Sequence, residues 1–145
     1  LDPLARYFLW EHSLDYDHGT GHGVGVFSNV HQGPQGISRL NTVPLNPGMI
    51  LSVEPGVYLE GKLGIRLENL VYVKMKSGYS GQKKKFLEFE TLTLVPFEKK
   101  LIEKKLLSLN ELHWLNSYHH NVYKKLSPFL NVSEKTWLRD ACKIL

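Results

Sequence analysis

Cysteine and long apolar runs are scarce in this chain of 145 residues. The one cysteine, Cys142, excludes an internal disulfide framework and a cysteine-rich zinc module. No apolar run reaches the roughly 20 residues that a helix needs to span a bilayer, so no membrane helix is expected. The chain starts at Leu1 without a basic segment followed by an apolar one, so we expect no signal peptide. Together these features predict a cytoplasmic protein whose sequence begins inside a longer polypeptide.

Apolar and aromatic residues, in contrast, are plentiful. Hydrophobic residues make up 42% of the chain, which includes 3 Trp, 7 Tyr and 6 Phe. So much apolar surface would collapse in water, which excludes an intrinsically disordered chain. The length is that of one ordinary domain and is enough to bury a core.

Positive charge is concentrated in the second half. Residues 1–73 contain 4 Lys and Arg against 7 Asp and Glu, whereas residues 74–145 contain 14 against 7. The lysines form short clusters without interleaved aromatic residues or a recognition motif (Lys83 to Lys85, Lys99-Lys100, Lys104-Lys105 and Lys124-Lys125). We expect a solvated surface, with an acidic partner as the alternative, and neither nucleic acid nor membrane as a partner.

Turn residues and periodicity divide the chain into two parts. A helix is expected over residues 3–13, begun by Asp2 as the cap and by Pro3. Strands are expected at 49–53, 64–73 and 86–95, with strand segments and close backbone approach in the glycine-rich segment 18–36 and a basic loop at 74–85. Beyond Pro96, helical patterns around 106–122 and 137–145 are separated at Ser127-Pro128. These patterns predict a β-rich part, 1–80, and a part made of one strand and helices, 81–145.

Three histidines, His18, His22 and His31, lie within 14 residues of glycine-rich sequence. Imidazole binds metals and carries protons near neutral pH, so this group is a candidate site, although exposed loop histidines would give the same pattern. The glycines around His18 and His22 oppose the helix of a zinc-protease motif. On a strand and turn, one of these two could bind a metal while the other meets a substrate.

Glu54 and Glu68 are the candidate carboxylates. Glu54 ends a predicted strand, and Glu68 lies within the alternating strand beside Arg66, where a carboxylate is costly unless it is paired or binds a cation. A surface ladder of Arg66 and Glu68, or a solvated strand end at Glu54, remains open. Two carboxylates and a histidine that converge would suit Mn²⁺, Co²⁺ or Zn²⁺.

Several long segments resemble Xaa-Pro aminopeptidases (aminopeptidase P) of metallopeptidase family M24. The matching segments keep the family's order along the chain: LDYDHGTGHGVG at 14–25, NVHQGP at 29–34, SVEPGVY at 52–58, GIRLEN at 64–69, FLEFETLTLVP at 86–96 and WLNSYH at 114–119. The resemblance implies the pita-bread α/β (α+β) fold with a helical C-terminal tail. It also implies cleavage of the N-terminal Xaa-Pro bond by a hydroxide that bridges two divalent ions, with Mn²⁺ first and Co²⁺ or Zn²⁺ as alternatives.

The same resemblance implies a role for each candidate residue. His22 and Glu68 would bind metal, and Glu54 would bind metal and take the proton of the attacking water. His31 would stabilise the tetrahedral intermediate and His18 would line the substrate pocket. The resemblance also makes Arg66 a residue that orients Glu68.

The family's metal centre also needs two aspartates from strands that precede the histidine segment, and this chain begins too late to contain them. Asp15 and Asp17 lie in the loop before the histidines and are not expected to be ligands. The chain would therefore hold three of five metal ligands and be inactive alone, whereas the intact protein would form a homodimer.

Two other functions remain open. A prolidase shares the fold and metals but takes free dipeptides; the segment at 89–94 favours aminopeptidase P. A catalytically silent pita-bread module would serve binding alone, but such modules lose ligands, and His22, Glu54 and Glu68 all stand here. The helical tail, with Trp114, Leu115, Tyr118 and Trp137, would pack on its own domain or support a dimer.

Overall fold

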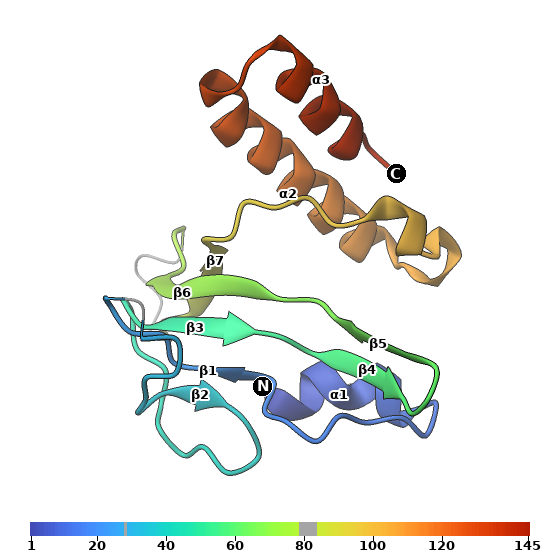
Figure 1. Ribbon diagram of the computed structural model, residues 1–145. Helices are drawn as coiled ribbons and strands as arrows, with labels where there is room; N and C mark the ends of the chain where they lie inside the picture. Colours follow the sequence, from blue (N-terminus) through green and yellow to red (C-terminus); the bar gives the residue numbers. More distant parts are fainter. Residues whose placement is uncertain (28, 79–83) are drawn as a thin grey trace. The chain divides into compact units, whose positions relative to one another are not determined.

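The computed structural model describes residues 1–27, 29–78 and 84–145 (Figure 1). The chain forms two compact units, Leu1–Thr93 and Leu94–Leu145. Part of the expected basic loop, residues 79–83 with Lys83, lies outside the described residues.

The first helix, α1, comprises Asp2–Trp10, which confirms a helix near the expected place. The prediction that Asp2 caps it is wrong, because Leu1 is the N-cap residue and makes no side-chain cap. Asp2 lies in the first turn, where its carboxylate instead accepts a hydrogen bond from Arg6 Nε at 2.9 Å. A charged partner one turn away gives this buried carboxylate a stronger bond than a backbone amide would.

An antiparallel sheet holds the core of the first unit. Its strand order is β3 (Ile50–Val53), β6 (Asn69–Met75) and β7 (Leu87–Thr91), and Figure 1 shows them side by side. Alternation places Val71 and Val73 of β6 on the same face, where they pack with Leu51 and Ile37. The strands expected at 49–53 and 86–95 are therefore confirmed in shorter form.

The single strand expected at 64–73 is wrong. The structure has two strands there, β5 (Leu63–Arg66) and β6, and Leu67 and Glu68 lie between them. β5 pairs with β4 (Gly56–Leu59) in a hairpin, whereas β6 pairs with β3. The break faces the Glu54-Pro55 break between β3 and β4, where Leu67 N–H donates to Pro55 O at 3.1 Å. Proline has no N–H to return, so the ladder cannot run through.

The glycine-rich segment forms two very short strands, β1 (Gly21–His22) and β2 (Gly36–Ile37), which pair with each other. The close backbone approach predicted here is confirmed at Gly21, where an added Cβ would lie 2.0 Å from Ser52 O. A second glycine, Gly23, bridges to Leu51 of β3. Absence of side chains thus lets the histidine segment lie directly beside β3.

The second unit is helical. It contains α2 (Leu109–Leu126) and α3 (Val132–Ala141), with 3₁₀ turns at Lys99–Leu101, Lys104–Leu106 and Ser127–Phe129. Capping boxes start both helices, from Ser108 with Glu111 and from Asn131 with Glu134. The buried residues of its core are Tyr118, Val122, Leu138 and Cys142. None of the described helices is long and apolar enough to cross a bilayer.

Candidate functional site

Glu54 lies directly after β3 and is buried. Its backbone N–H donates to Thr20 O at 2.7 Å. Its Oε1 accepts from Ser52 Oγ at 3.0 Å, and its Oε2 accepts from Arg66 Nη1 at 3.1 Å. A buried carboxylate needs such partners, so the segment after β3 is built to hold this one charge in place.

His22 on β1 faces the same carboxylate. Its Nε2 lies 3.1 Å from Glu54 Oε1, and its backbone N–H donates to Ser52 Oγ at 3.0 Å. Its Nδ1 lies 3.0 Å from Gly23 O, which can only accept, so Nδ1 carries a proton. The lone pair of a neutral His22 therefore meets a carboxylate oxygen, and a proton or a metal cation would satisfy both. This donor pair fits a divalent metal.

His31 lies against His22, with the two ring centroids 4.1 Å apart. Its side chain is exposed, in contrast to that of Glu54. The structure therefore brings His22, His31, Glu54 and Arg66 into one neighbourhood.

His18 reaches this neighbourhood through Tyr58, a residue to which sequence analysis gave no role. Tyr58 Oη accepts from Arg66 Nε at 2.9 Å and lies 2.8 Å from His18 Nε2. Because His18 Nδ1 donates to Gly19 O at 2.7 Å, Nε2 is the acceptor for the Tyr58 proton. The hydrogen bond to Tyr58, and then the charges of Glu54 and Glu68, raise the pKa of Arg66. Only its place in the SVEPGVY segment could have drawn attention to Tyr58.

Glu68 is not part of a closed ligand group. Its side chain is exposed, in the break between β5 and β6. In the part of the chain that the structure describes, no three His, Cys, Asp or Glu side chains gather closely enough to hold a metal ion. His22 and Glu54 thus form a pair of candidate ligands. Glu68 lies close enough for its charge to raise the pKa of Arg66.

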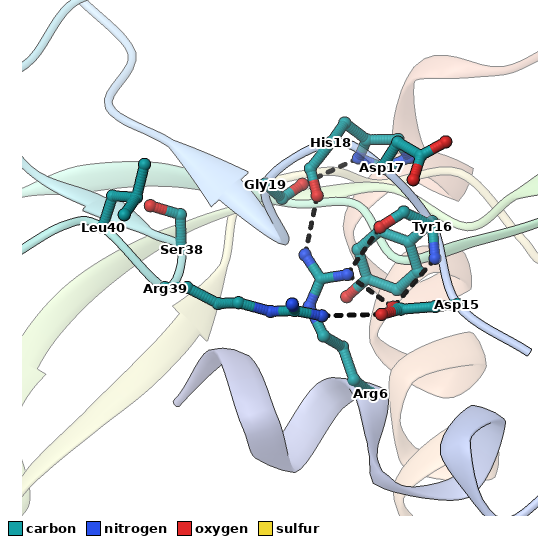
Figure 2. A pocket seen from close by; sticks show the side chains of 9 residues that line it. All are labelled: Arg6, Asp15, Tyr16, Asp17, His18, Gly19, Ser38, Arg39 and Leu40. Carbon is teal, nitrogen blue, oxygen red and sulfur yellow. Dashed lines mark hydrogen bonds and ion pairs between the residues drawn. The ribbon is translucent and has the colours of Figure 1, made fainter.

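A hollow of about 290 Å³ lies next to His18. The hollow is lined by the 15–19 segment together with Arg6, Ser38, Arg39 and Leu40 (Figure 2). Asp15 accepts from Arg6 Nη1 and from Arg39 Nη2, each at 2.6 Å. A hydrogen bond from Trp10, and then those from Arg6 and the Tyr16 amide, hold the pKa of Asp15 well below its usual range. Each carboxylate oxygen of Asp15 is therefore in an ion pair with an arginine.

Two family models match the chain. Metallopeptidase family M24 matches residues 1–75, and the C-terminal region of peptidase M24 matches residues 85–145. A probable Xaa-Pro aminopeptidase P of Botryotinia fuckeliana is 50% identical over 95% of this chain and 22% of its own length. A protein of the same description from Laccaria bicolor is 45% identical over 100% of this chain and 24% of its own.

A crystal structure is similar as well. X-prolyl aminopeptidase from Caenorhabditis elegans, described as a cytosolic enzyme with a di-nuclear active site, has a TM-score of 0.92 and 42% identity. The match covers 99% of this chain and 24% of that one, so the chain spans about a quarter of the length of these relatives. The predicted α+β, pita-bread architecture with C-terminal helices is confirmed. The chain belongs to metallopeptidase family M24.

Proposed function

We propose that the whole protein is an Xaa-Pro aminopeptidase, which hydrolyses the N-terminal bond of peptides whose second residue is proline. The observation that carries this proposal is the 3.1 Å approach of His22 Nε2 to Glu54 Oε1 in a chain of family M24. Similarity to relatives described as Xaa-Pro aminopeptidases supports the substrate class.

His22, Glu54 and Glu68 are the residues of this chain that would hold two divalent ions, with Mn²⁺ preferred over Co²⁺ or Zn²⁺. When bound, such ions polarise a carbonyl and lower the pKa of a water molecule. The two opposed acceptors, His22 Nε2 and Glu54 Oε1, support cation binding at this pair. Glu68 would join them by turning its exposed side chain toward the pair.

Each remaining candidate has a role that its position supports. Glu54 takes the proton of the attacking water, while Arg66 holds its other oxygen. His31, exposed beside His22, donates to the developing oxyanion of the substrate. His18, held by Tyr58 and the Gly19 carbonyl, lines the pocket for the proline ring.

The family pattern that this chain resembles has five metal ligands, and three of them correspond to His22, Glu54 and Glu68. We therefore expect the 145-residue chain alone to be inactive, with the remaining aspartate ligands supplied by the rest of the protein. Residues 1–80 would form the C-terminal part of the pita-bread domain and residues 81–145 its C-terminal module. The whole protein would be a cytoplasmic homodimer.

A binding module is the second candidate function. It is favoured by one observation, namely that the described residues hold no group of three metal-ligating side chains. A prolidase-like dipeptidase would share the pair His22 and Glu54 and differ in the length of its substrate.

The test compares the whole protein with the 145-residue chain on an Xaa-Pro-Xaa tripeptide and an Xaa-Pro dipeptide, with Mn²⁺ and with a chelator. We expect the whole protein to cleave the tripeptide before proline only with metal, and the short chain to be inactive. Activity of the short chain would contradict the ligand assignment. Cleavage of the dipeptide alone would favour a prolidase, and no cleavage by either would favour the binding module.

A further inference from the structure

Arg6 is an arginine of α1 whose side chain is almost completely buried, with 3% of the residue exposed. Its Nε donates to Asp2 Oδ2 at 2.9 Å, and its guanidinium lies 3.9 Å from the centroid of the Tyr16 ring. The buried charge is neutralised by Asp2 and Asp15, both at hydrogen-bond distance. Burial of an arginine costs free energy, which the contacts of its side chain must offset.

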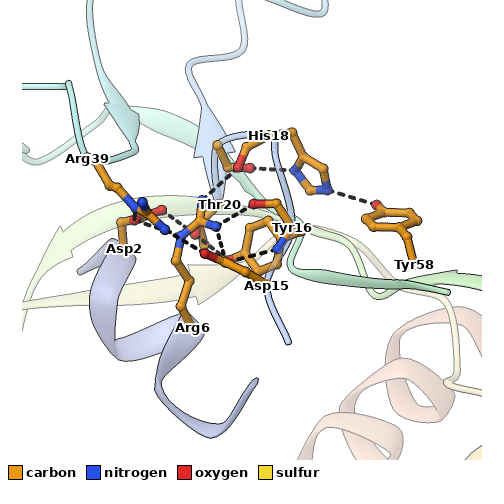
Figure 3. A network of polar contacts seen from close by, with 9 residues as sticks. Asp2, Arg6, Asp15, Tyr16, His18, Thr20, Arg39 and Tyr58 are labelled. Carbon is orange, nitrogen blue, oxygen red and sulfur yellow. Dashed lines mark hydrogen bonds and ion pairs between the residues drawn. The ribbon is translucent and has the colours of Figure 1, made fainter. Parts of the chain in front are cut away.

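Two of those contacts are to the backbone that leads into His18. Nη1 donates to Tyr16 O at 2.6 Å, and Nη2 donates to His18 O at 2.7 Å (Figure 3). The planar guanidinium thus donates hydrogen bonds to the carbonyls of the two residues that flank Asp17. A rigid fork of this kind fixes the path of the chain, whereas a lysine would offer only a point charge.

The acidic partner of Arg6 extends the cluster toward Glu54. Asp2 Oδ1 accepts from Thr20 Oγ1 at 2.6 Å, and Thr20 O accepts from the Glu54 N–H at 2.7 Å. Thr20 is buried. The same buried pair, Arg6 with Asp2, therefore contacts the backbone of His18 directly and the backbone of Glu54 through Thr20.

We propose that Arg6 is a positioning residue, which fixes the place of His18 relative to Glu54 and thereby sets the preference for proline at the second position of the substrate. This inference rests on the proposed function, in which His18 lines the pocket for the proline ring. The ring of His18 is hydrogen-bonded to Gly19 O and Tyr58, and it packs on the Tyr16 ring with centroids 4.8 Å apart. Because Arg6 holds the carbonyls of both Tyr16 and His18, the place of this ring follows the backbone that Arg6 fixes. A shift of about 1 Å in such a group costs about 100-fold in rate.

Arg39 provides a matched control. It pairs with Asp15 at 2.6 Å and lies 4.0 Å from Asp2, the same two carboxylates that Arg6 meets. Its side chain, however, is 58% exposed. Arg6→Lys and Arg39→Lys therefore keep the charge at both places, and Arg6→Lys alone removes the fork from the carbonyls of Tyr16 and His18.

The experiment uses the whole protein and two readouts. The first is amide hydrogen exchange of the peptide that covers residues 14–22. The second is the ratio of kcat/KM for Xaa-Pro-Xaa to that for Xaa-Ala-Xaa, with the number of Mn²⁺ ions bound measured alongside. We expect Arg6→Lys to speed exchange about tenfold or more and to lower the ratio about tenfold, with bound Mn²⁺ unchanged. Arg39→Lys should leave both readouts within about threefold.

Unchanged exchange in Arg6→Lys would overturn the proposal, and so would an equal loss of kcat/KM on both peptides or a loss of bound Mn²⁺, which a merely structural role predicts. If the wild-type protein cleaved neither peptide, the proposed function would fail and the specificity role with it, whereas exchange would still decide whether Arg6 holds the backbone. Should Arg6→Lys not fold, Asp2→Asn loosens the same cluster with Arg6 in place. It should change both readouts in the same direction by a smaller factor, and no change in a folded Asp2→Asn protein would contradict the proposal.

Discussion

The two compact units of this chain bury polar groups in different ways. Among the described residues, the first unit buries five polar or charged side chains, Asp2, Arg6, Thr20, Ser52 and Glu54, whereas the second unit buries His119 alone. The second unit has a core of Tyr118, Val122, Leu138 and Cys142. A buried ion pair adds little stability compared with apolar residues of the same size, so the buried charges of the first unit point to a role other than stability.

The polar groups of the two units also differ in the residues to which they bond. In the first unit, buried polar side chains form hydrogen bonds to candidate site residues. Ser52 bonds to Glu54 and His22, and Arg6 bonds to the carbonyl of His18. In the second unit, polar contacts join parts of the helical fold to each other: Lys99 Nζ donates to the carbonyl of Asp140, in the last turn of α3, at 2.8 Å. Changes in the two units should therefore affect different properties.

The largest effect should come from Glu54→Gln in the whole protein. Loss of the carboxylate removes both a metal ligand and the acceptor of the water proton, so cleavage before proline should fall by roughly 10²–10⁴-fold. Glu60→Gln is the matched control, since Glu60 is exposed in the turn after β4, and it should keep wild-type activity. Steady-state kinetics on an Xaa-Pro-Xaa peptide measure both; equal losses would place the effect outside the site.

A second prediction concerns the stability of the first unit. Arg6→Met removes the cation that lies 2.9 Å from the buried carboxylate of Asp2 and leaves Arg39 Nε, 4.0 Å away, as the remaining charged partner. This loss should cost about 3–5 kcal/mol in the free energy of unfolding. The exposed pair of Arg39 with Asp15 contributes about 0–1 kcal/mol, so Arg39→Met should change little. Urea unfolding measures both variants. Equal effects would show that the Arg6 cluster is no more than a surface ion pair.

In the second unit, truncation of the core should act on stability. Leu138 is 2% exposed and packs in the core of α2 and α3, so Leu138→Ala should cost about 2–5 kcal/mol. Leu101→Ala, at an exposed leucine, should cost less than about 0.5 kcal/mol. Denaturant unfolding gives both values, and a silent Leu138→Ala would mean that the helices do not form a core in solution.

The smallest effect should be a pH dependence from His119. Its Nε2 accepts from the Phe97 N–H at 3.0 Å, and its Nδ1 has no partner among the described residues. Burial, and then the charge of Lys99, lower the pKa of His119. The unfolded state therefore binds the proton first, and the second unit should lose stability as pH falls through the normal histidine pKa of about 6.5.

His119→Gln should flatten this pH dependence, because glutamine can accept from Phe97 and does not titrate. The neighbouring His120→Gln, at an exposed histidine, should leave it unchanged. Thermal unfolding at pH 5 and pH 7 measures the slope. A wild-type chain more stable at pH 5 than at pH 7 would have the wrong sign for a buried neutral histidine.

Sequence patterns predicted the elements that depend on local chemistry. The first helix, the strand before Glu54 and the close approach at Gly21 follow from a proline in the first helical turn, from the turn residues on either side of the strand, and from glycine. The strand over 64–73 was wrong because alternation continues through Leu67 and Glu68, whereas the pairing partner changes at Pro55. Which strand pairs with which is decided by tertiary packing, and periodicity does not encode it.

Sequence patterns also singled out His22 and Glu54 as candidate ligands, which the structure brings to 3.1 Å. They gave no role to Tyr58 or Arg6, because the bonds of these residues join segments far apart in the chain. Tyr58 meets His18, 40 residues earlier, and Arg6 reaches the carbonyl of His18 from α1. Contacts between segments this far apart leave no signature in a single sequence.

The most direct test of the proposed metal site is a count of Mn²⁺ ions bound by the whole protein and by its His22→Ala and Glu54→Gln variants. The count uses calorimetric titration, with His120→Gln as the control. If His22 and Glu54 are ligands, the wild type and the control should bind two ions, and each site variant should bind fewer. Unchanged binding in both site variants would contradict the proposal that the pair of His22 and Glu54 holds the metal.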